Sequence, residues 1–584
     1  MPAQRFHGWF VALAAAVVLL PRLGAPALWD DDEPKNAACS LAMLDRDDWV
    51  VPTYNGRLRV EKPPLVNWVQ IAGFTLCGRN ETGARLGSAL ATIGTCLLTW
   101  RLGCLLLGSA EGFVGGLVMA TCVWTAVGGR AATPDAALTF LTTLGLWLFV
   151  RGIGPDALRS GRPRLSCGAA LAVGATMGAA TLAKGPVGVV LPLTAMCLFG
   201  LWAEAVRAAS PAASVAGLAR AVLALRPATM LAAAIGVAGP WYAWVAVRTA
   251  GEWPRGFLVV HNLERFARPM EGHSGSVLYY PAVLCVGLFP WSIVLAAMLA
   301  HAVAILRSRD DDDRRGGVAL SACWLAAWIG GFTLAGTKLP GYVWPAYPAL
   351  AVATGGFLVD WARGGTALAA WCRDPRPDPR RVDDLVMRVA WCILGAAGLA
   401  VTVGLPLLAH RASAGGWWLC LPGFVPLVTA VVAWRTQATG RPWRSLAAVA
   451  VGGCLFVAAI AAPVAEWFSR AQGPRALVAG LPHAAADGEW ACLWNVPPSL
   501  VFYSGCRIDR LETPADVVDH LTARPRSRVV IDSRQEGVVM PLLPAGVAVL
   551  ARVPTIGDHD YLLLGREVAE RPAAALAAIA PPER

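Results

Sequence analysis

Charged and polar side chains that stand directly beside long apolar runs are the residues of this sequence that could do chemistry. A charge within the hydrocarbon of a membrane costs at least about 2.5–3.5 kcal/mol, so such a residue usually has a partner or a function. The set consists of Asp32, Glu33, Glu61, Lys62, Asp135, Lys184, His261, Glu264, Arg265, His273, Lys338 and Tyr342.

The segment from Asp30 to Pro64 is the most informative part of the chain. It is acid-rich at its start, and its end, Glu61-Lys62-Pro63-Pro64, abuts an apolar run. The two prolines hold the backbone extended, which would fix the direction of Lys62. We expect this loop to form the floor of an active site for a lipid-linked substrate.

Four cations among these residues, Lys62, Lys184, Arg265 and Lys338, suggest a site that grips a phosphate while a carboxylate acts on a nucleophile. Each residue alone has a simpler explanation. The two lysines at 184 and 338 could extend to the lipid headgroups, and Asp135 could cap the helix that begins at its Thr-Pro-Asp turn. His261 alone would more often be packed than bound to a metal. The functional interpretation depends on all of them converging on one face.

The composition indicates an integral membrane protein, because 56% of the 584 residues are hydrophobic and only 15% are charged. The net charge of +11 does not point to nucleic acid, since most arginines lie in short connections, where they orient helices. The 15 cysteines are scattered without a Cys-x-x-Cys pair, which argues against a zinc ribbon or a disulfide scaffold.

About thirteen apolar runs are long enough to be membrane spans. Basic residues such as Arg101, Arg151, Arg207, Arg307 and Arg363 recur in alternate connections, so these connections are predicted to be cytoplasmic. The first loop, the loop at 250–276 and the tail after 467 then lie on the other side. The expected spans are 10–20, 86–107, 111–128, 134–152, 167–185, 186–204, 228–248, 277–305, 317–336, 342–362, 387–409, 416–434 and 445–467.

The tail has a different composition and predicts a small domain. We expect a membrane domain over 1–467, with a periplasmic loop at 29–82, and a periplasmic α/β domain over 468–584 that serves as a lid or structural cap. A disulfide between Cys492 and Cys506 is also expected there. The predicted strands are 491–494, 500–503, 529–531, 547–550 and 561–564, with one helix near 514–521.

Several motifs of this sequence together resemble those of a known protein family. Asp32-Glu33, Ala37, Met43-Leu44, Asp48-Trp49-Val50-Val51-Pro52 and Glu61-Lys62-Pro63 resemble the opening signature of the bacterial aminoarabinose transferases, which modify lipid A and are similar to the wider protein-mannosyltransferase-like family. The similarity continues through residues 182–186, 264–266, 279–281, 288–291 and 338–342. It covers about the first 350 residues.

The resemblance implies a C-type glycosyltransferase fold: a polytopic α-helical membrane protein with about thirteen transmembrane helices, two surface helices in the first outer loop and a small periplasmic α/β domain. It also implies inverting transfer of a sugar from undecaprenyl phosphate, without a nucleotide cofactor, to an envelope acceptor such as lipid A, with 4-amino-4-deoxy-L-arabinose as the model sugar. The site would lie on the periplasmic face of the bacterial inner membrane. The expected partners are the donor, the acceptor and membrane lipids, and nucleic acid is not one.

The site residues follow from the same resemblance. Asp32 resembles the catalytic carboxylate, with Glu33 and Asp135 as further candidates. Glu61 matches a position proposed to bind a divalent metal ion, and His261 is a further candidate ligand by its side chain. Lys62, Lys184, Arg265, Lys338 and Tyr342 match positions at or near the lipid phosphate.

The chain departs from the family pattern at Asn36, at Pro134-Asp135 and at His261-Asn262, which leaves the sugar and the acceptor open. Transfer of another polyprenyl-linked sugar to protein or polysaccharide is the alternative. A polyprenyl-lipid transporter is another, although such a protein should show inverted repeats with interrupted spans.

Overall fold

The computed structural model describes residues 2–207, 215–270, 272–308, 313–371, 378–411, 416–469, 473–479, 489–555 and 559–566. The chain folds into two compact units. The helical unit comprises Met1–Pro21, Val60–Val66 and Leu86–Ala461, and the mixed unit comprises Arg22–Arg59, Asn67–Arg85 and Ala462–Arg584. Most of the first loop therefore groups with the C-terminal segment, whereas Glu61 and Lys62 belong to the helical unit.

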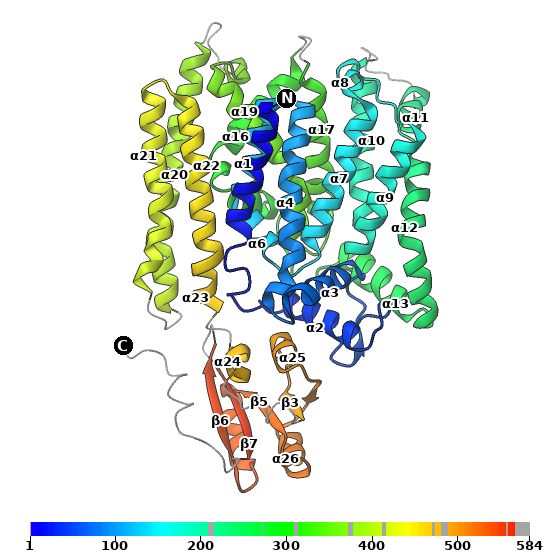
Figure 1. The fold of residues 1–584 in the computed structure, drawn as a ribbon, viewed down its shortest axis with the longest axis vertical. Helices are drawn as coiled ribbons and strands as arrows, with labels where there is room; N and C mark the ends of the chain where they lie inside the picture. Colours follow the sequence, from blue (N-terminus) through cyan, green and yellow to red (C-terminus); the bar gives the residue numbers. More distant parts are fainter. Residues whose placement is uncertain are drawn as a thin grey trace. The chain divides into compact units, whose positions relative to one another are not determined.

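The helical unit contains the elements that could cross a membrane (Figure 1). Ten of the described helices are long and apolar enough to do so, and a pair bent by 57°, Ser109–Thr121 and Val123–Gly129, is an eleventh candidate. Two further expected spans correspond to the shorter apolar helices Phe6–Leu19 and Trp291–Arg307. The chain is a multi-pass membrane protein.

The elements of this unit, including helices that cross into the mixed unit, are α1 (Pro2–Leu19), α4 (Glu81–Leu106), α5 (Ser109–Thr121), α6 (Val123–Gly129), α7 (Asp135–Ile153), α8 (Pro155–Ser160), α9 (Cys167–Lys184), α10 (Val187–Arg207), α11 (Val215–Ala224), α12 (Pro227–Arg248), α13 (Glu252–Arg255), η1 (Gly256–Glu264), α14 (Arg265–Ala267), α15 (Tyr279–Gly287), η2 (Trp291–Val294), α16 (Leu295–Arg307), α17 (Arg315–Leu325), η3 (Ala326–Gly330), α18 (Gly331–Leu334), η4 (Pro340–Ala346), α19 (Tyr347–Arg363), η5 (Ala367–Trp371), α20 (Pro379–Arg411), η6 (Trp417–Cys420), α21 (Leu421–Ala438), α22 (Pro442–Ala459) and η7 (Ile460–Val464).

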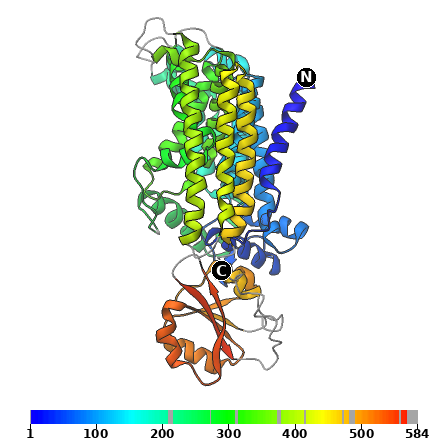
Figure 2. The same cartoon turned by 90° about the vertical axis from the view of Figure 1, so that its left-hand side faces the viewer.

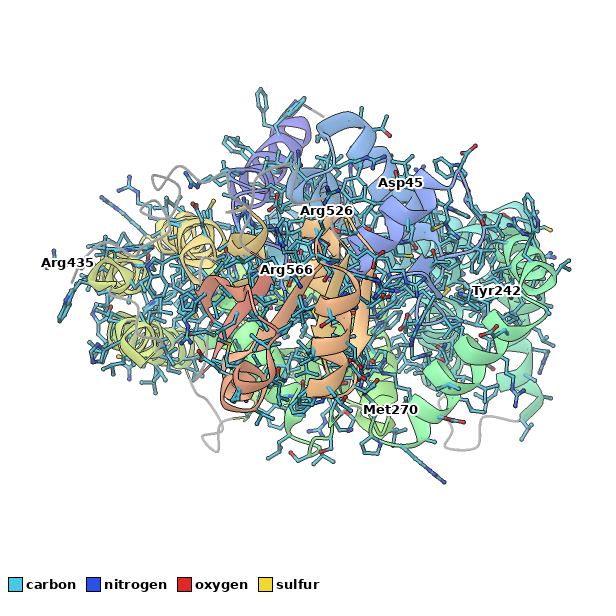
Figure 3. The ribbon with its side chains drawn as sticks, turned by 90° about the horizontal axis from the view of Figure 1, so that it is seen from below. Asp45, Tyr242, Met270, Arg435, Arg526 and Arg566 are labelled. Carbon is cyan, nitrogen blue, oxygen red and sulfur yellow. The ribbon has the colours of Figure 1, made fainter. Side chains whose placement is uncertain are left out.

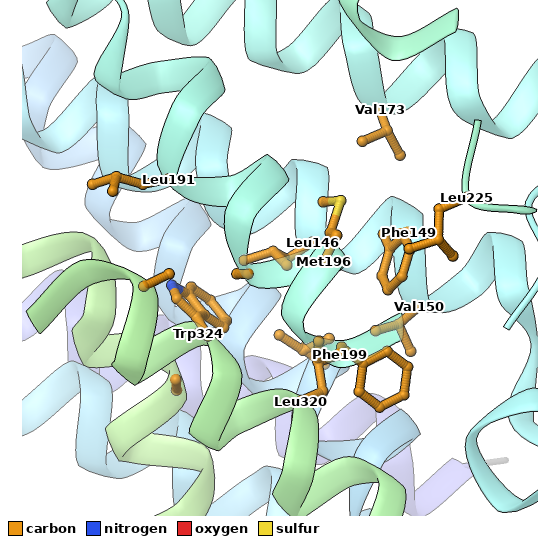
Figure 4. Close-up of a cluster of buried hydrophobic side chains, with 14 of the residues drawn as sticks. Leu146, Phe149, Val150, Val173, Leu191, Met196, Phe199, Leu225, Leu320 and Trp324 are labelled. Carbon is orange, nitrogen blue, oxygen red and sulfur yellow. The ribbon is translucent and has the colours of Figure 1, made fainter. Parts of the chain in front are cut away.

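Close helix packing holds the part of this unit that carries the functional residues. Phe149 of α7, Phe199 of α10 and Trp324 of α17 share one buried cluster (Figure 4). Beside it, α9 approaches α12 through glycines: a Cβ on Gly174 would lie 2.2 Å from the carbonyl oxygen of Met230. Because lipid is as apolar as the side chains, such tight contact is what drives helices together in a membrane.

The mixed unit contains a five-stranded sheet in the order β4-β3-β5-β7-β6, with β3 parallel to β4 and β5 and the remaining pairs antiparallel (Figure 2). Its elements are α2 (Asp32–Asp45), β1 (Thr53–Tyr54), β2 (Arg57–Leu58), α3 (Leu65–Cys77, which begins in the helical unit), α23 (Ala465–Ser469), α24 (Gly473–Ala479), β3 (Trp490–Leu493), α25 (Pro498–Ser504), β4 (Ile508–Leu511), α26 (Pro514–Ala523), β5 (Arg528–Asp532), η9 (Ser533–Gln535), α27 (Glu536–Val539), η10 (Met540–Leu542), β6 (Val547–Pro554) and β7 (Asp560–Arg566). The first loop thus holds two helices, as the resemblance implies.

One predicted strand is wrong. Residues 500–503 lie in helix α25, which begins at Pro498 and ends at Ser504, and the next residue, Gly505, has a φ of 66°. Proline at the first position and glycine after the last are the two end signals of a helix. The strand that pairs with β3 is instead β4, which follows this helix.

The expected disulfide is also wrong, because Cys492 and Cys506 are not joined. Cys492 is aligned with Arg510 in the pairing of β3 and β4, and Cys506 lies four residues before Arg510. Cys506 also lies in a bend before β4 begins at Ile508, so it is not opposite Cys492 in the sheet. Both side chains instead pack into one hydrophobic core.

A buried ion pair fixes the first loop within the mixed unit. The guanidinium of Arg85 donates to both carboxylate oxygens of Glu33, at 2.9 and 2.7 Å. It also donates to the carbonyl oxygens of Leu23, Pro26 and Ala27. With side chains only 3% and 5% exposed, the pair is stable because its remaining donors are also satisfied.

Asp30 joins the loop to the C-terminal part of the same unit. Its carboxylate accepts hydrogen bonds from the backbone N–H and the hydroxyl of Ser499, at 2.7 and 2.5 Å. Desolvation by the surrounding protein raises the pKa of Asp30 from 3.8 to about 6, although these two bonds oppose the shift.

This pKa predicts a pH-dependent stability of the mixed unit. The folded state holds the Asp30 proton more tightly than the unfolded chain, so the contribution of Asp30 to stability falls as pH rises from about 4 to about 6 and is constant above. Asp30→Asn removes this titration. The parent should lose stability relative to Asp30→Asn as pH rises over this range. The difference between the thermal midpoints of the variant and the parent should therefore increase and then level off. The increase should be small, because the carboxylate is partly exposed. A difference that is flat from pH 4 to 7 would contradict the assignment.

Candidate functional site

The helical unit contains a partly open cavity of about 800 Å³, and most of the predicted site residues line it. Polar and charged side chains form part of its lining, and apolar side chains, many of them from α10, η1, η3 and α18, form much of the rest. Glu61, Lys62, Lys184, His261, Arg265 and Tyr342 line the cavity together.

Lys62 reaches the cavity from the segment just before α3. Pro63 follows it in the lining, and both prolines are buried, so this short stretch is packed; it contains bends at Glu61 and Lys62 and a turn at Pro64, and not the extended backbone expected from the two prolines. Glu61 lines the same cavity. The predicted placement of this pair beside the apolar run is therefore what the structure shows.

Lys184 is the last residue of α9, and its ammonium forms an ion pair with Asp135, the first residue of α7. The same ammonium lies 4.9 Å from the centre of the Tyr342 ring, a cation–π contact. Both members of the pair are mostly buried, at 14% and 18% exposure. Asp135 does not cap its helix through its side chain. Its partner is the lysine.

The position of Lys184 depends on the residue after it. Gly185 ends α9 with φ of 83°, and a Cβ there would lie 2.5 Å from the ring of Phe257. Pro186 then cannot continue the helix. The Leu-Ala-Lys-Gly-Pro motif is thus a helix stop that places a cation at a C-terminus, where the helix dipole favours it.

His261 and Arg265 come from the end of η1 and the start of α14. The π-helical turns of η1 are wider than those of an α-helix, a feature found often at functional sites. Phe257 fastens η1 by stacking on Trp253, with ring centres 4.9 Å apart, and Trp253 in turn contacts Trp241 of α12 at 4.7 Å. This aromatic cluster holds the wall that presents Arg265.

Lys338 does not line the cavity. It is buried, and its ammonium donates to the carbonyl oxygens of Thr333 and Ala335, both at 2.8 Å. Its predicted contact with phosphate stays a prediction; the partners that the structure shows for the ammonium are these two backbone carbonyls.

Asp32 and Glu33 lie in the mixed unit, at the start of α2. Asp32 is exposed, whereas Glu33 is 4% exposed and both of its oxygens accept hydrogen bonds from Arg85. This geometry gives Glu33 a structural role. Of the two acidic residues, Asp32 is the one with an accessible carboxylate.

Glu61 and His261 offer one oxygen and one nitrogen ligand from the cavity wall. Across the residues that the structure describes, no group of three or more His, Cys, Asp or Glu side chains is arranged to hold a metal. Catalytic zinc sites usually have three protein ligands. The divalent metal ion stays a prediction.

The residues that form the apolar part of the cavity lining were not identified from the sequence. Gly330 and Gly331 lie in the lining at the junction of η3 and α18, where a Cβ on Gly330 would meet nothing within 4 Å. Adjacent glycines inside an apolar helical run weaken the helix, and this is the signal that could have marked them. Their missing side chains leave room in the cavity.

The chain resembles known transferases in sequence. Residues 61–237 match the family described as dolichyl-phosphate-mannose-protein mannosyltransferase. A protein named undecaprenyl phosphate-alpha-4-amino-4-deoxy-L-arabinose arabinosyl transferase from Edwardsiella ictaluri is 28% identical over 358 residues, 61% of this chain and 60% of that protein. One of the same name from Pseudomonas aeruginosa is 30% identical over 369 residues, again 61% and 60%. The chain thus spans about 60% of the length of these relatives.

Solved structures extend the likeness to the whole chain. ArnT from Cupriavidus metallidurans in the apo state superposes with a TM-score of 0.73 and 22% identity over 100% of both chains. The structure of the same ArnT protein bound to undecaprenyl phosphate superposes with a TM-score of 0.71 and covers 98% of this chain and 99% of that one. The resemblance to the aminoarabinose transferases is confirmed. The chain has their fold.

In this aminoarabinose transferase-like protein, the ion pair of Asp135 and Lys184 gives a test of the site. Asp135→Asn leaves a mostly buried ammonium without its carboxylate, and Lys184→Met leaves the carboxylate without its ammonium. Each single variant should have a lower free energy of unfolding than the parent. The loss should be at most the ~3–5 kcal/mol found when one partner of a fully buried pair is removed.

The double variant should lose less than the sum of the two, because no uncompensated charge remains. Thermal unfolding of the four purified proteins in detergent measures this coupling. Losses that simply add would show that the two side chains do not stabilise one another.

Proposed function

We propose that this protein is an inverting glycosyltransferase that moves a sugar from an undecaprenyl-phosphate-linked donor to an envelope acceptor. Lipid A is the proposed acceptor, and 4-amino-4-deoxy-L-arabinose or a close relative is the proposed sugar. The reaction is placed at the periplasmic face of the bacterial inner membrane, consistent with the alternation of basic connections along the chain.

The observation that carries the proposal is the composition of the cavity wall. Lys62, Lys184 and Arg265 gather at a cavity whose other walls include Val187, Val190 and Leu191 of α10. Cations suit a phosphate, and an apolar wall among membrane helices suits a hydrocarbon chain. A polyprenyl phosphate has both parts.

The proposed chemistry breaks the bond between the anomeric carbon and the phosphate oxygen. The bonding electrons pass to that oxygen, so the departing lipid phosphate gains negative charge while the sugar becomes positive. The acceptor oxygen bonds to the anomeric carbon from the opposite side, which inverts the configuration. Lys62 and Arg265 stabilise the leaving phosphate more strongly as its charge grows, and this difference is what accelerates a reaction.

Asp32 is proposed to act on the acceptor side, a role taken from its motif. With a hydroxyl acceptor, it would take the proton as the new bond forms. With a phosphate acceptor such as that of lipid A, no proton needs to be removed, and the carboxylate would orient the acceptor or stabilise the sugar cation.

A protein acceptor is the second candidate, because the matched family is described as a protein mannosyltransferase. Purified protein in nanodiscs should be given an undecaprenyl-phosphate aminoarabinose donor with lipid A or with peptide acceptors. Mass spectrometry then reports which acceptor gains the sugar. A protein that neither binds undecaprenyl phosphate nor transfers the sugar would overturn the proposal.

Two variants should separate the donor side from the acceptor side. Lys62→Met should weaken binding of undecaprenyl phosphate and also slow turnover, since the cation acts before and during bond breaking. Asp32→Asn keeps the shape of the side chain, so donor binding should stay near the parent value while turnover falls about a hundredfold, the usual scale for losing a general base. Parent turnover in a folded Asp32→Asn protein would remove this residue from the mechanism.

Filling the cavity should block the lipid chain. Gly330→Trp adds an indole where the structure has open space along the lining, so it should fold and yet bind undecaprenyl phosphate at least about tenfold more weakly. Gly236→Trp is a matched control, because a Cβ on Gly236 of α12 also meets nothing within 4 Å and Gly236 does not line the cavity. If both variants bind undecaprenyl phosphate with equal affinity, the hydrocarbon chain of the lipid does not occupy this cavity.

A further inference from the structure

The short segment Gly336–Lys338, which we call the strap, joins α18 to η4 and is hydrogen-bonded to the residues that follow η1. The amide of Gly336 donates to the carbonyl oxygen of Phe266 at 2.7 Å, and the amide of Thr337 donates to the backbone carbonyl oxygen of Arg265 at 3.3 Å. The amide of Lys338 donates to the carbonyl oxygen of His273 at 3.0 Å. Three consecutive amides thus hold one neighbouring segment.

The side chain of Thr337 adds a second connection. Its hydroxyl donates to the carbonyl oxygen of Arg268 at 3.0 Å and accepts from the amide of Met270 at 3.1 Å. Met270 is labelled in Figure 3. Thr337 is fully buried, so both hydrogen bonds are shielded from water. Because the hydroxyl makes these two bonds, it is a poor candidate for a ligand contact although Thr337 lines the cavity.

Gly336 makes the close approach possible. A Cβ at this position would lie 2.8–3.0 Å from backbone atoms of Arg268. A backbone neighbour cannot move aside as a flexible side chain can, so a larger residue would push the strap away from the Arg265 segment.

Lys338 anchors the other end of the strap to α18. Its ammonium binds the carbonyl oxygens of Thr333 and Ala335, at the C-terminal end of the helix that lines the cavity. A cation at this end satisfies carbonyls that have no further helical turn to pair with. The strap is therefore fixed both to the cavity wall and to the segment that carries Arg265.

We propose that Thr337 and Lys338 are positioning residues, which act on the donor phosphate through Arg265 and do not bind it themselves. This inference rests on the proposed function for its ligand, but the strap itself can be tested without any ligand. It assigns to Lys338 a role different from that of the cations at the cavity.

The first experiment measures hydrogen–deuterium exchange of the ligand-free full-length protein. Thr337→Val keeps the shape and removes both hydroxyl bonds, so the Met270 amide and its neighbours at 265–270 should exchange at least about tenfold faster. Thr333→Val is the matched control, because the Thr333 hydroxyl bonds only to Ile329 in the preceding turn. Unchanged exchange at 265–270 in Thr337→Val would refute the strap.

The second experiment measures coupling, with undecaprenyl phosphate as the probe. Arg265→Met should weaken binding about tenfold or more, the scale of a lost hydrogen bond to a charged group. If Thr337 and Lys338 act through Arg265, adding Thr337→Val or Lys338→Met to Arg265→Met should cause no further loss beyond about twofold. Losses that multiply would show that they act independently, as direct ligands would.

Lys338→Arg completes the series. It keeps donors for the two carbonyls and should restore exchange and affinity toward parent values, whereas Lys338→Met should not. If Arg265→Met alone leaves binding unchanged, the proposed phosphate site fails, and the exchange experiment still decides whether the strap exists.

Discussion

The cost of an uncompensated charge among apolar helices decides where the polar residues of this protein lie. Arg85 is buried and binds both oxygens of Glu33, and Lys184 is paired with Asp135. Other buried cations are stabilised by hydrogen bonds to backbone carbonyls. Arg130 donates to the carbonyl oxygens of Val18, Leu19 and Pro21 at the end of α1. Lys338 uses the same solution at the end of α18. The contacts of Lys184 and Lys338 hold helix ends at and beside the cavity, so the same constraint that limits buried charges also shapes this part of the helical unit.

Residues that carry the same charge therefore differ in role according to their partners. Glu33 and Asp32 are neighbours in sequence, yet one is enclosed by a guanidinium and the other is exposed. Lys184 and Lys338 both follow apolar helices, yet one reaches the cavity and the other turns to carbonyls beside it. A family motif identifies the positions that matter, but the partners decide whether a position binds a ligand or holds the residue that does.

The sequence predicted the features that depend on local pattern. Apolar runs located the described spans, and Lys62, Lys184, Arg265 and Tyr342 do gather at one cavity. It did not show which partners the charged residues take: Arg85 binds Glu33, 52 residues away, and the ammonium of Lys338 binds the nearby carbonyls of Thr333 and Ala335. Residues 500–503 are different: the prolines before them and Gly505 after them were visible as helix ends, and β-propensity was given too much weight.

The charges around the cavity match what the proposed reaction needs. Three cations, Lys62, Lys184 and Arg265, face two carboxylates, Glu61 and the paired Asp135, which leaves an excess of one positive charge. A sugar phosphodiester carries one negative charge and would balance it. The departing monoester approaches two. Lys338 contributes through the segment that carries Arg265, because its ammonium is bound by two carbonyl oxygens and it does not line the cavity. Lys62 and Arg265 would then attract the departing phosphate more strongly than the donor, and an interaction that grows as the bond breaks lowers the barrier to departure.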